Sequence, residues 1–214
     1  WQIAQSVMLW VDQGASMRFS SDVKLPQKID RARLLGLAVA IMLQRGGERV
    51  GLTGTALPPR SGRPQILRLA EMFCKDDPAD YAPPEHRAMI PHARALFISD
   101  FMGDLEGVTL ALTKAADRGE RGVLCHLLDP SEEAFPFSGR TIFQSIGGTL
   151  SHETLKASDL KSRYLERLAE RKSELQRLCA LTGWHYGVHH TNASAQSALL
   201  WLYSALDTRA GMAA

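Results

Sequence analysis

The chain has 214 residues, of which 45% are hydrophobic and 22% are charged, so it is long and apolar enough to bury one substantial core. We therefore expect a single domain over residues 1–214. The formal net charge is only +2, which argues against nucleic acid or an acidic membrane surface as a partner. The longest apolar run, Leu34 to Leu43, is too short to span a bilayer.

The cysteines and the first residue indicate the setting of the protein. Cys74, Cys125 and Cys179 show no Cys-x-x-Cys spacing and are too few for a disulfide framework. Reduced thiols of this kind favour a cytoplasmic protein. The sequence begins at Trp1 without a signal-peptide pattern, so we expect a fragment that lacks an upstream segment.

Strands and helices are predicted to alternate along the chain. Short apolar runs predict strands, and apolar residues three or four positions apart predict helices. In chain order we expect a strand that runs into Asp12, a helix from Lys28 to Gln44, a strand from Arg49 to Thr53, a helix from Arg63 to Phe73, a loop from Lys75 to His92, a strand that ends at Asp100, a helix from Leu105 to Arg118, a strand from Gly122 to Asp129, a long helix from Ser158 to Gly183, a strand from Trp184 to His189, and a helix from Ser194 to Asp207. The predicted fold class is therefore α/β, with a doubly wound, mostly parallel central sheet flanked by helices.

The excursion from Pro130 to Gly148 interrupts this alternation. It begins with Glu132 and Glu133 close to Asp129, and paired acids can act as general acid and base when their environments separate their pKa values. Adjacent acids beside a proline are more often a solvated face or the first turn of a helix, and we favour that interpretation. The apolar residues of the excursion predict a small hairpin or flap anchored by Phe135, Phe137, Ile142 and Phe143.

Two aspartates follow predicted strands. Asp12 ends the strand in VMLWVDQGASM, and Asp100 ends the strand in LFISDF. Ligands collect beyond the carboxyl ends of strands in a parallel sheet, and Mg²⁺ prefers hard oxygen ligands. Asp12, Ser16 and Asp100 are therefore candidate ligands of Mg²⁺ or Mn²⁺. The alternative is that a strand-end aspartate caps the following loop by accepting backbone N–H bonds, without any ion.

These motifs resemble the von Willebrand factor A-like fold. The resemblance lies in VMLWVDQGASM, in the K-x-D-x-A-R that opens the next helix, and in LFISDF about 80 residues on. More narrowly, GVLCHLLDPSEEAFPFSGRTIF resembles the bacterial family called domain of unknown function fifty-eight, whose genes accompany MoxR-type AAA+ ATPases. The resemblance covers essentially the whole chain and implies a Rossmann-like three-layer sandwich.

The metal-ion-dependent adhesion site of that fold reads Asp-x-Ser-x-Ser, with a distant Thr and a distant Asp. This pattern matches Asp12, Ser16 and Asp100, but Gly14 stands where it has a serine. A metal would take a water there and bind more weakly. Gly14 also permits a backbone conformation that suits a reshaped loop without metal. The residues that could replace the distant threonine are Ser61 and Thr55.

The resemblance implies a protein-binding module that acts through the carboxyl edge of its sheet at a degenerate adhesion site. The residues that would contact the partner are Asp12, Gly14, Ser16 and Asp100. A MoxR-type AAA+ ATPase is the implied partner, and this chain would serve as its adaptor. The sequence has no P-loop, so ATP hydrolysis would come from the partner.

The alternative function is a Mg²⁺-dependent phosphatase or phosphotransfer domain. Asp12 would be the nucleophile and Asp100 a metal ligand. Such chemistry normally uses a second acid two residues after the nucleophile, where this chain has a glycine. It also uses a placed lysine, and Lys114 is the candidate that the sequence offers.

Overall fold

The central element is a parallel sheet of five strands in the order β2-β1-β3-β4-β7. The computed structural model describes residues 4–75, 77–87, 90–139, 141–144, 151–154 and 157–207. The strands of the sheet are β1 (Ser6–Val11), β2 (Arg49–Leu52), β3 (Arg94–Ser99), β4 (Arg121–Leu128) and β7 (His185–His190). All four pairings between neighbouring strands are parallel, which confirms the predicted central sheet.

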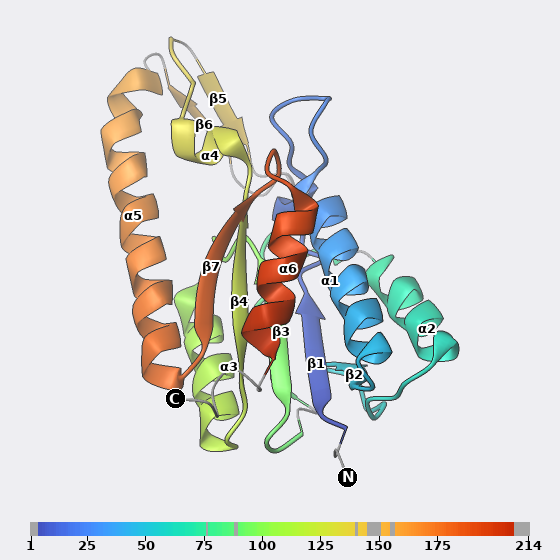
Figure 1. Ribbon diagram of the computed structural model, residues 1–214. Coiled ribbons are helices and arrows are strands. Elements are labelled where there is room, and N and C mark those ends of the chain that lie inside the picture. Colours follow the sequence, from blue (N-terminus) through green and yellow to red (C-terminus); the bar gives the residue numbers. More distant parts are fainter. Residues whose placement is uncertain are drawn as a thin grey trace.

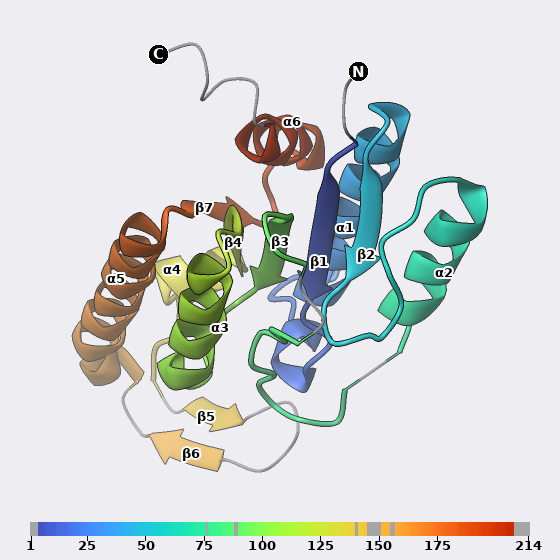
Figure 2. The same cartoon turned by 90° about the horizontal axis from the view of Figure 1, so that it is seen from below.

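Helices cover both faces of the sheet, as the prediction of a doubly wound fold requires (Figures 1 and 2). One face is covered by α1 (Lys28–Arg45) and α6 (Ala195–Leu206), with α2 (Arg63–Phe73) beside α1. The other face is covered by α3 (Leu105–Asp117) and α5 (Ala157–Thr182). The described bounds of these elements agree with the predicted ones to within one or two residues.

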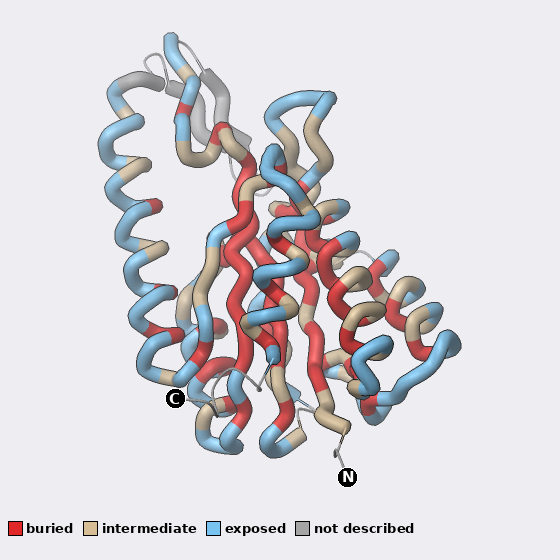
Figure 3. The backbone as a smooth tube through the Cα atoms, in the orientation of Figure 1, coloured by how far each residue is buried: buried red, intermediate tan, exposed pale blue. Residues whose placement is uncertain are grey.

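Two apolar clusters lie on the two faces of the sheet, because successive side chains of a strand point in opposite directions. In β1, Val7 and Leu9 belong to the cluster under α1 and α6, and Met8 belongs to the cluster under α3 and α5. Figure 3 shows that β1, β3 and β4 are buried along most of their length. Burial on both faces explains the nearly continuous apolar runs in these strands.

The excursion after β4 contains a helix that the sequence analysis did not predict as a separate element. This helix, α4 (Pro130–Ala134), begins with a capping box in which Asp129 and Glu132 bind each other's backbone N–H groups. The predicted hairpin follows it as an antiparallel pair, β5 (Thr141–Gln144) and β6 (Ser151–Thr154).

The predicted aromatic anchoring of the excursion is confirmed for its first part. The Phe135 ring centroid lies 5.2 Å from that of Phe137 and 4.9 Å from that of Tyr164 in α5. The predicted anchoring by Ile142 and Phe143 concerns side chains that lie outside the described part of the structure.

The carboxyl ends of the strands face the top of Figure 1, where the loop before α1, the short α4 and the β5–β6 pair gather. The loop after β1 contains a short 3-10 helix, η1 (Ala15–Arg18). Among the described helices, none combines the length and the apolar character needed to cross a bilayer.

Candidate functional site at the carboxyl edge of the sheet

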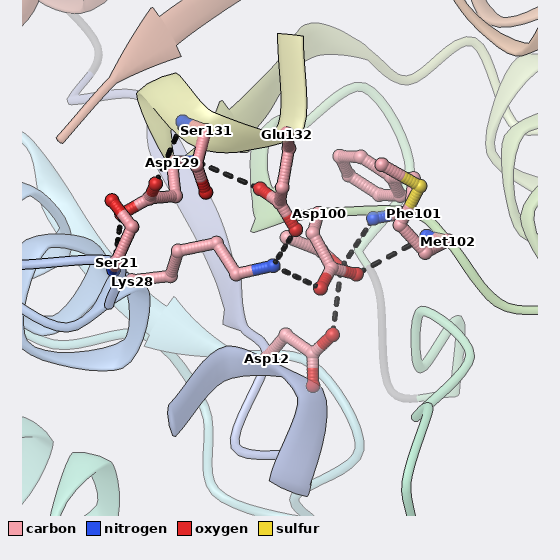
Figure 4. A network of polar contacts seen from close by, with 10 residues as sticks. Asp12, Ser21, Lys28, Asp100, Phe101, Met102, Asp129, Ser131 and Glu132 are labelled. Atoms are coloured by element: carbon pink, nitrogen blue, oxygen red, sulfur yellow. Dashed lines mark hydrogen bonds and ion pairs between the residues drawn. The ribbon is translucent and has the colours of Figure 1, made fainter. Parts of the chain in front are cut away.

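Asp12 and Asp100 lie next to each other at the carboxyl edge of the sheet. They follow β1 and β3, which are adjacent and parallel, with Val11 opposite Ile98. Both aspartates are buried, and Figure 4 shows their side chains pointing toward each other. The backbone of two neighbouring strands therefore fixes the position of this pair.

Asp12 accepts a short hydrogen bond on each carboxylate oxygen. The Gly14 N–H donates to Oδ1 at 2.7 Å, and the Ser99 hydroxyl donates to Oδ2 at 2.6 Å. Burial raises the pKa of Asp12 to about 7, with a further increase from the negative charge of Asp100, while the hydrogen bonds oppose the shift. The carboxyl group of Asp12 therefore titrates near neutral pH.

Asp100 is paired with a buried lysine. Lys28, the first residue of α1, is 1% exposed. Its Nζ lies 2.8 Å from Oδ2 of Asp100 and 2.7 Å from Oε1 of Glu132 (Figure 4). Burial by itself would raise the pKa of Asp100 and lower that of Lys28, but the ion pair outweighs burial and shifts both in the opposite directions. Both groups are therefore charged at neutral pH.

A second carboxylate connects this ion pair to α4. Glu132 accepts a hydrogen bond from Lys28 through Oε1 and one from the Asp129 N–H through Oε2. Asp129 in turn accepts from the N–H groups of Ser131 at 2.8 Å and Ser21 at 3.0 Å. Burial raises the pKa of Glu132 despite the attraction of Lys28. Lys28 is therefore the centre of a network that joins α1, the end of β3 and α4.

The turn after Asp100 directs backbone amides toward the site. The Met102 N–H donates to Oδ1 of Asp100 at 3.1 Å, and the Phe101 N–H donates to the Ser99 hydroxyl at 2.9 Å. Phe101 has a φ of 47°, in the left-handed region that L residues rarely adopt. Local strain of this kind is concentrated at functional sites, so the turn adds support for a function at this edge.

A distant segment crosses over the loop that follows β1. The N–H groups of Ala15 and Ser16 donate to the carbonyls of Ala79 and Asp80 at 2.8 and 2.9 Å. A Cβ at Gly14 would lie 3.1 Å from the Asp80 carbonyl oxygen and 3.3 Å from that of Ala79. Since the φ of Gly14 is −60°, the glycine avoids a tight contact with the crossing segment rather than allowing an unusual backbone conformation. The expectation of a special backbone conformation at this position was wrong.

A pocket of about 360 Å³ opens beside the two aspartates. Its walls come from the ends of β1 and β3, from residues 81–83 and from the start of α3. Tyr81 lines it and is 42% exposed. A Cβ at Gly103 would lie 2.7 Å from the Cβ of Tyr81, so the absence of a side chain there allows the tyrosine to pack closely. The acidic residues of the lining are Asp12, Asp100, Asp104 and Glu106.

Ser16 lies beside Asp100, whereas Ser61 and Lys114 lie at the other end of the sheet and the Thr55 hydroxyl is bound to the backbone. The Ser16 hydroxyl is buried beside Asp100 and helps to lower its pKa. The Thr55 hydroxyl donates to the carbonyl of Leu52 at 3.1 Å. Arg60, the residue before Ser61, pairs with Val50 near the start of β2, so Ser61 lies at the other end of the sheet. Lys114 is exposed in the last turn of α3, whereas the pocket lies at the first turn.

These residues do not fit a divalent cation. The ammonium of Lys28 occupies Oδ2 of Asp100, Asp12 already accepts on both oxygens, and Gly14 offers no hydroxyl. Within the described ranges, no three His, Cys, Asp or Glu side chains are grouped so that they could hold a metal ion. A buried ammonium also repels a second cation at short range. The residues that match the adhesion-site pattern therefore lack one hydroxyl, and their carboxylates are already bound to other groups of the chain.

The two glutamates of α4 lie in its first turn, as predicted, but they do not form a solvated face. Glu132 is bound to Lys28. Glu133 forms an ion pair with Lys172 of α5, and its Oε2 lies within hydrogen-bond distance, 2.7 Å, of Nε2 of His190 at the end of β7. Their position confirms one of the two predicted alternatives, the first turn of a helix, and both side chains are partly buried because α5 and β7 approach α4 at this edge.

Lys28 is the residue of this network that the sequence analysis missed. It is the lysine of K-x-D-x-A-R, and it stands at the first position of a helix, where the helix dipole favours acidic side chains. A lysine in that position is unfavourable unless an anion lies nearby. Asp100, already predicted at the same edge, was the available candidate, so the signal was present in the sequence.

Comparisons with known proteins add the family and related folds. The family described as "Protein of unknown function DUF58" matches residues 1–174. Among functionally curated proteins, none matches the sequence significantly. The structure resembles that of the conserved hypothetical protein BatB from Bacteroides thetaiotaomicron, with a TM-score of 0.53 and 15% identity over 95% of this chain and 98% of that chain.

A second solved structure gives a similar result. An aerotolerance-related membrane protein from Bacteroides fragilis, carrying multiple mutations to serines, matches with a TM-score of 0.52 and 14% identity over 95% of this chain and 98% of that chain. At this level of identity the likeness supports the fold alone. The match of the family over residues 1–174 shows more: the chain belongs to the family of proteins of unknown function DUF58, the family that its motifs resemble.

Proposed function

We propose that this chain is a protein-binding module of the von Willebrand factor A-like type, and that its carboxyl edge binds a MoxR-type AAA+ ATPase. The observation that carries the proposal is the pocket beside Asp12 and Asp100, which lies where parallel sheets bind ligands. The chain would act as an adaptor, and the ATPase would supply ATP hydrolysis. Membership of the family supports the choice of partner, because its genes accompany those of MoxR-type ATPases.

Two features of the pocket suit a binding surface. Tyr81 is half-exposed on its wall, and tyrosine is one of the residues that contribute most to protein interfaces. Asp12 and Asp100 are held rigidly by hydrogen bonds from the backbone and from Ser99. Preorganised groups of this kind lose little freedom on binding. In the proposal, Gly14 and Ser16 contribute the loop that borders the same edge.

The experiment is a binding measurement between this chain and a purified MoxR-type ATPase. Tyr81→Ala should weaken binding by roughly tenfold or more, because an interface tyrosine commonly contributes at least 1–2 kcal/mol. Leu181→Ala is the matched control, since Leu181 is exposed in the last turn of α5, at the opposite end of the sheet. Equal affinity of the Tyr81 variant and the wild type would contradict the proposed surface.

The phosphatase alternative has a separate test. Lys28 provides the placed lysine that this chemistry uses, but it is bound to Asp100 and Glu132. Both oxygens of Asp12, the required nucleophile, accept hydrogen bonds. We expect no turnover of a chromogenic phosphate in the presence of Mg²⁺. Turnover that disappears in Asp12→Ala would replace the binding function with an enzymatic one.

A further inference from the structure

Lys28 places a fixed positive charge at the edge where the adhesion site of related folds holds a divalent ion. Its ammonium is bound by Asp100 after β3 and by Glu132 in α4, at 2.8 and 2.7 Å. The ring of Phe19 lies on another side, with its centroid 5.7 Å from Nζ, and the lysine side chain is 2% exposed. The charge is therefore enclosed by three separate segments of the chain.

The ion pair uses the carboxylate that a metal would need. A divalent ion on Oδ2 of Asp100 would have to displace Nζ, and Lys28 would then be a buried charge without a partner. Such a charge is costly, because removing one member of a buried ion pair is strongly unfavourable. An ion beside an undisplaced Nζ would meet the repulsion of a second cation at short range. Neither arrangement favours a bound metal.

We propose that the ammonium of Lys28 replaces the divalent cation of the adhesion site and holds the carboxyl edge in its binding arrangement without metal. The inference rests on the proposed function for the claim that this edge binds a partner. The claim that the ammonium replaces a cation rests on the two carboxylates that contact Nζ. Asp100 and Glu132 come from different elements, as the ligands of a metal would, and Lys28 joins both to the start of α1.

The replacement explains two departures from the adhesion-site pattern. Gly14 lacks the hydroxyl that would bind a metal, and the segment of Ala79 and Asp80 occupies the space where that side chain would lie. An ammonium held by Asp100 and Glu132 does not need that hydroxyl. Glu132 has no place in the adhesion-site pattern, and the structure gives it a role as the second anion of the lysine.

The test is a thermal melt of the wild type and of Lys28→Met in a series of MgCl₂ or MnCl₂ concentrations, with chelator as reference. The inference expects the wild-type Tm to be the same with ion and with chelator, since an ion that binds only the folded state would raise it. Lys28→Met keeps the apolar stem and should lower the Tm by roughly 10 °C. Lys24→Met, which changes an exposed lysine of the loop that precedes α1, is the matched control and should melt like the wild type.

Two results would overturn the inference. One is a saturable rise of the wild-type Tm with Mg²⁺ or Mn²⁺ that is lost in Asp100→Asn. The other is a Lys28→Met variant that melts like Lys24→Met. If Lys28→Met does not fold, equilibrium dialysis of the wild type against Mn²⁺ decides: no binding at millimolar ion supports the inference, and one equivalent bound overturns it. The melts and the dialysis use this chain alone, so their results do not depend on whether it binds a MoxR-type ATPase. The two proposals can therefore be contradicted independently.

Discussion

Two buried ionisable side chains lie at opposite ends of the sheet and differ in their partners. At the carboxyl edge, Lys28 is bound by Asp100 and Glu132. At the amino edge, Glu120 precedes β4 and is 0% exposed. Neither of its carboxylate oxygens has a hydrogen-bond partner in the part of the chain that the structure describes. Burial raises the pKa of Glu120 to about 7, and the attraction of Arg118 only partly opposes it.

The comparison shows that partners, rather than burial, decide the charge of an interior group. Lys28 is as deeply buried as Glu120, but its pKa moves in the direction that keeps it charged. The pKa of Glu120 moves in the direction that neutralises it. The charge of Lys28 persists because two carboxylates contact its ammonium at the carboxyl edge.

The largest expected effect comes from removing the paired charge. Lys28→Met should lower the free energy of unfolding by about 3–5 kcal/mol, because it leaves Asp100 and Glu132 buried beside each other without a cation. Urea denaturation at neutral pH measures the change. Adding Asp100→Asn to the same chain should recover part of the loss. If the double variant is as unstable as the sum of the two single variants, the ion pair is not the cause.

The buried carboxylate of Glu120 should make the stability of the folded protein fall as the pH rises. The folded-state pKa of Glu120 is raised from 4.5 to about 7, so the folded protein holds a proton that the unfolded chain releases. The contribution of Glu120 to stability is present below pH 4.5 and is lost as the pH rises through about 7. Glu120→Gln should therefore be more stable than the wild type above pH 7, by roughly 3 kcal/mol.

Denaturation of the wild type and Glu120→Gln at a series of pH values measures this difference. Glu106→Gln serves as the control, because Glu106 lies in the exposed first turn of α3. A wild type and a Glu120→Gln variant with parallel stability profiles would mean that Glu120 is paired after all, and the contrast between the two edges would disappear.

A smaller effect is expected at the outer end of the lysine network. Asp129→Ala removes the cap of α4 and the hydrogen bond to Ser21, so unfolding should become easier by about 2 kcal/mol. Amide exchange should speed up at Ser131 and Ser21 before it does in the strands. Unchanged exchange at Ser21 would show that the loop before α1 is held by other contacts.

The smallest expected effect tests the crossing segment. Gly14→Ala would place a Cβ 3.1 Å from the Asp80 carbonyl oxygen, and this tight contact should reduce stability by about 1 kcal/mol. Faster exchange of the Ala15 and Ser16 amides, which bind the same segment, would report the local displacement. A variant that is more stable than the wild type would mean that the segment can move aside without loss.

The fold could be predicted from the sequence because its signals are local. Apolar runs such as the one that ends at Asp100 and helical spacing such as that after Ser194 mark each element directly, and strand-to-helix alternation leaves few topologies. The same logic predicted that Asp12 and Asp100 would lie at one edge. A first helical turn at Glu132 and Glu133 was one of two predicted alternatives, but the extent of α4 was not predicted, because a helix of five residues is too short to show helical spacing.

The remaining parts of the site depend on tertiary contacts that periodicity does not record. The Lys28 ammonium lies several bonds from its backbone, so its partners are set by how α1 docks on the sheet. The crossing of Ala79 and Asp80 over Gly14 depends on the path of a loop without regular structure. Ser61 was placed at the wrong end because the sequence does not show that Arg60 turns back to pair with β2.

The covalent attachment of the Lys28 ammonium changes what can switch this edge. A diffusible ion occupies its ligands according to its free concentration, so dilution or chelation empties the site, whereas a side chain anchored to α1 has an effective concentration that the cell does not vary. The edge would stay assembled through any fluctuation in magnesium. Control over partner binding would then have to come from the partner itself, such as its nucleotide state, or from competition for the pocket.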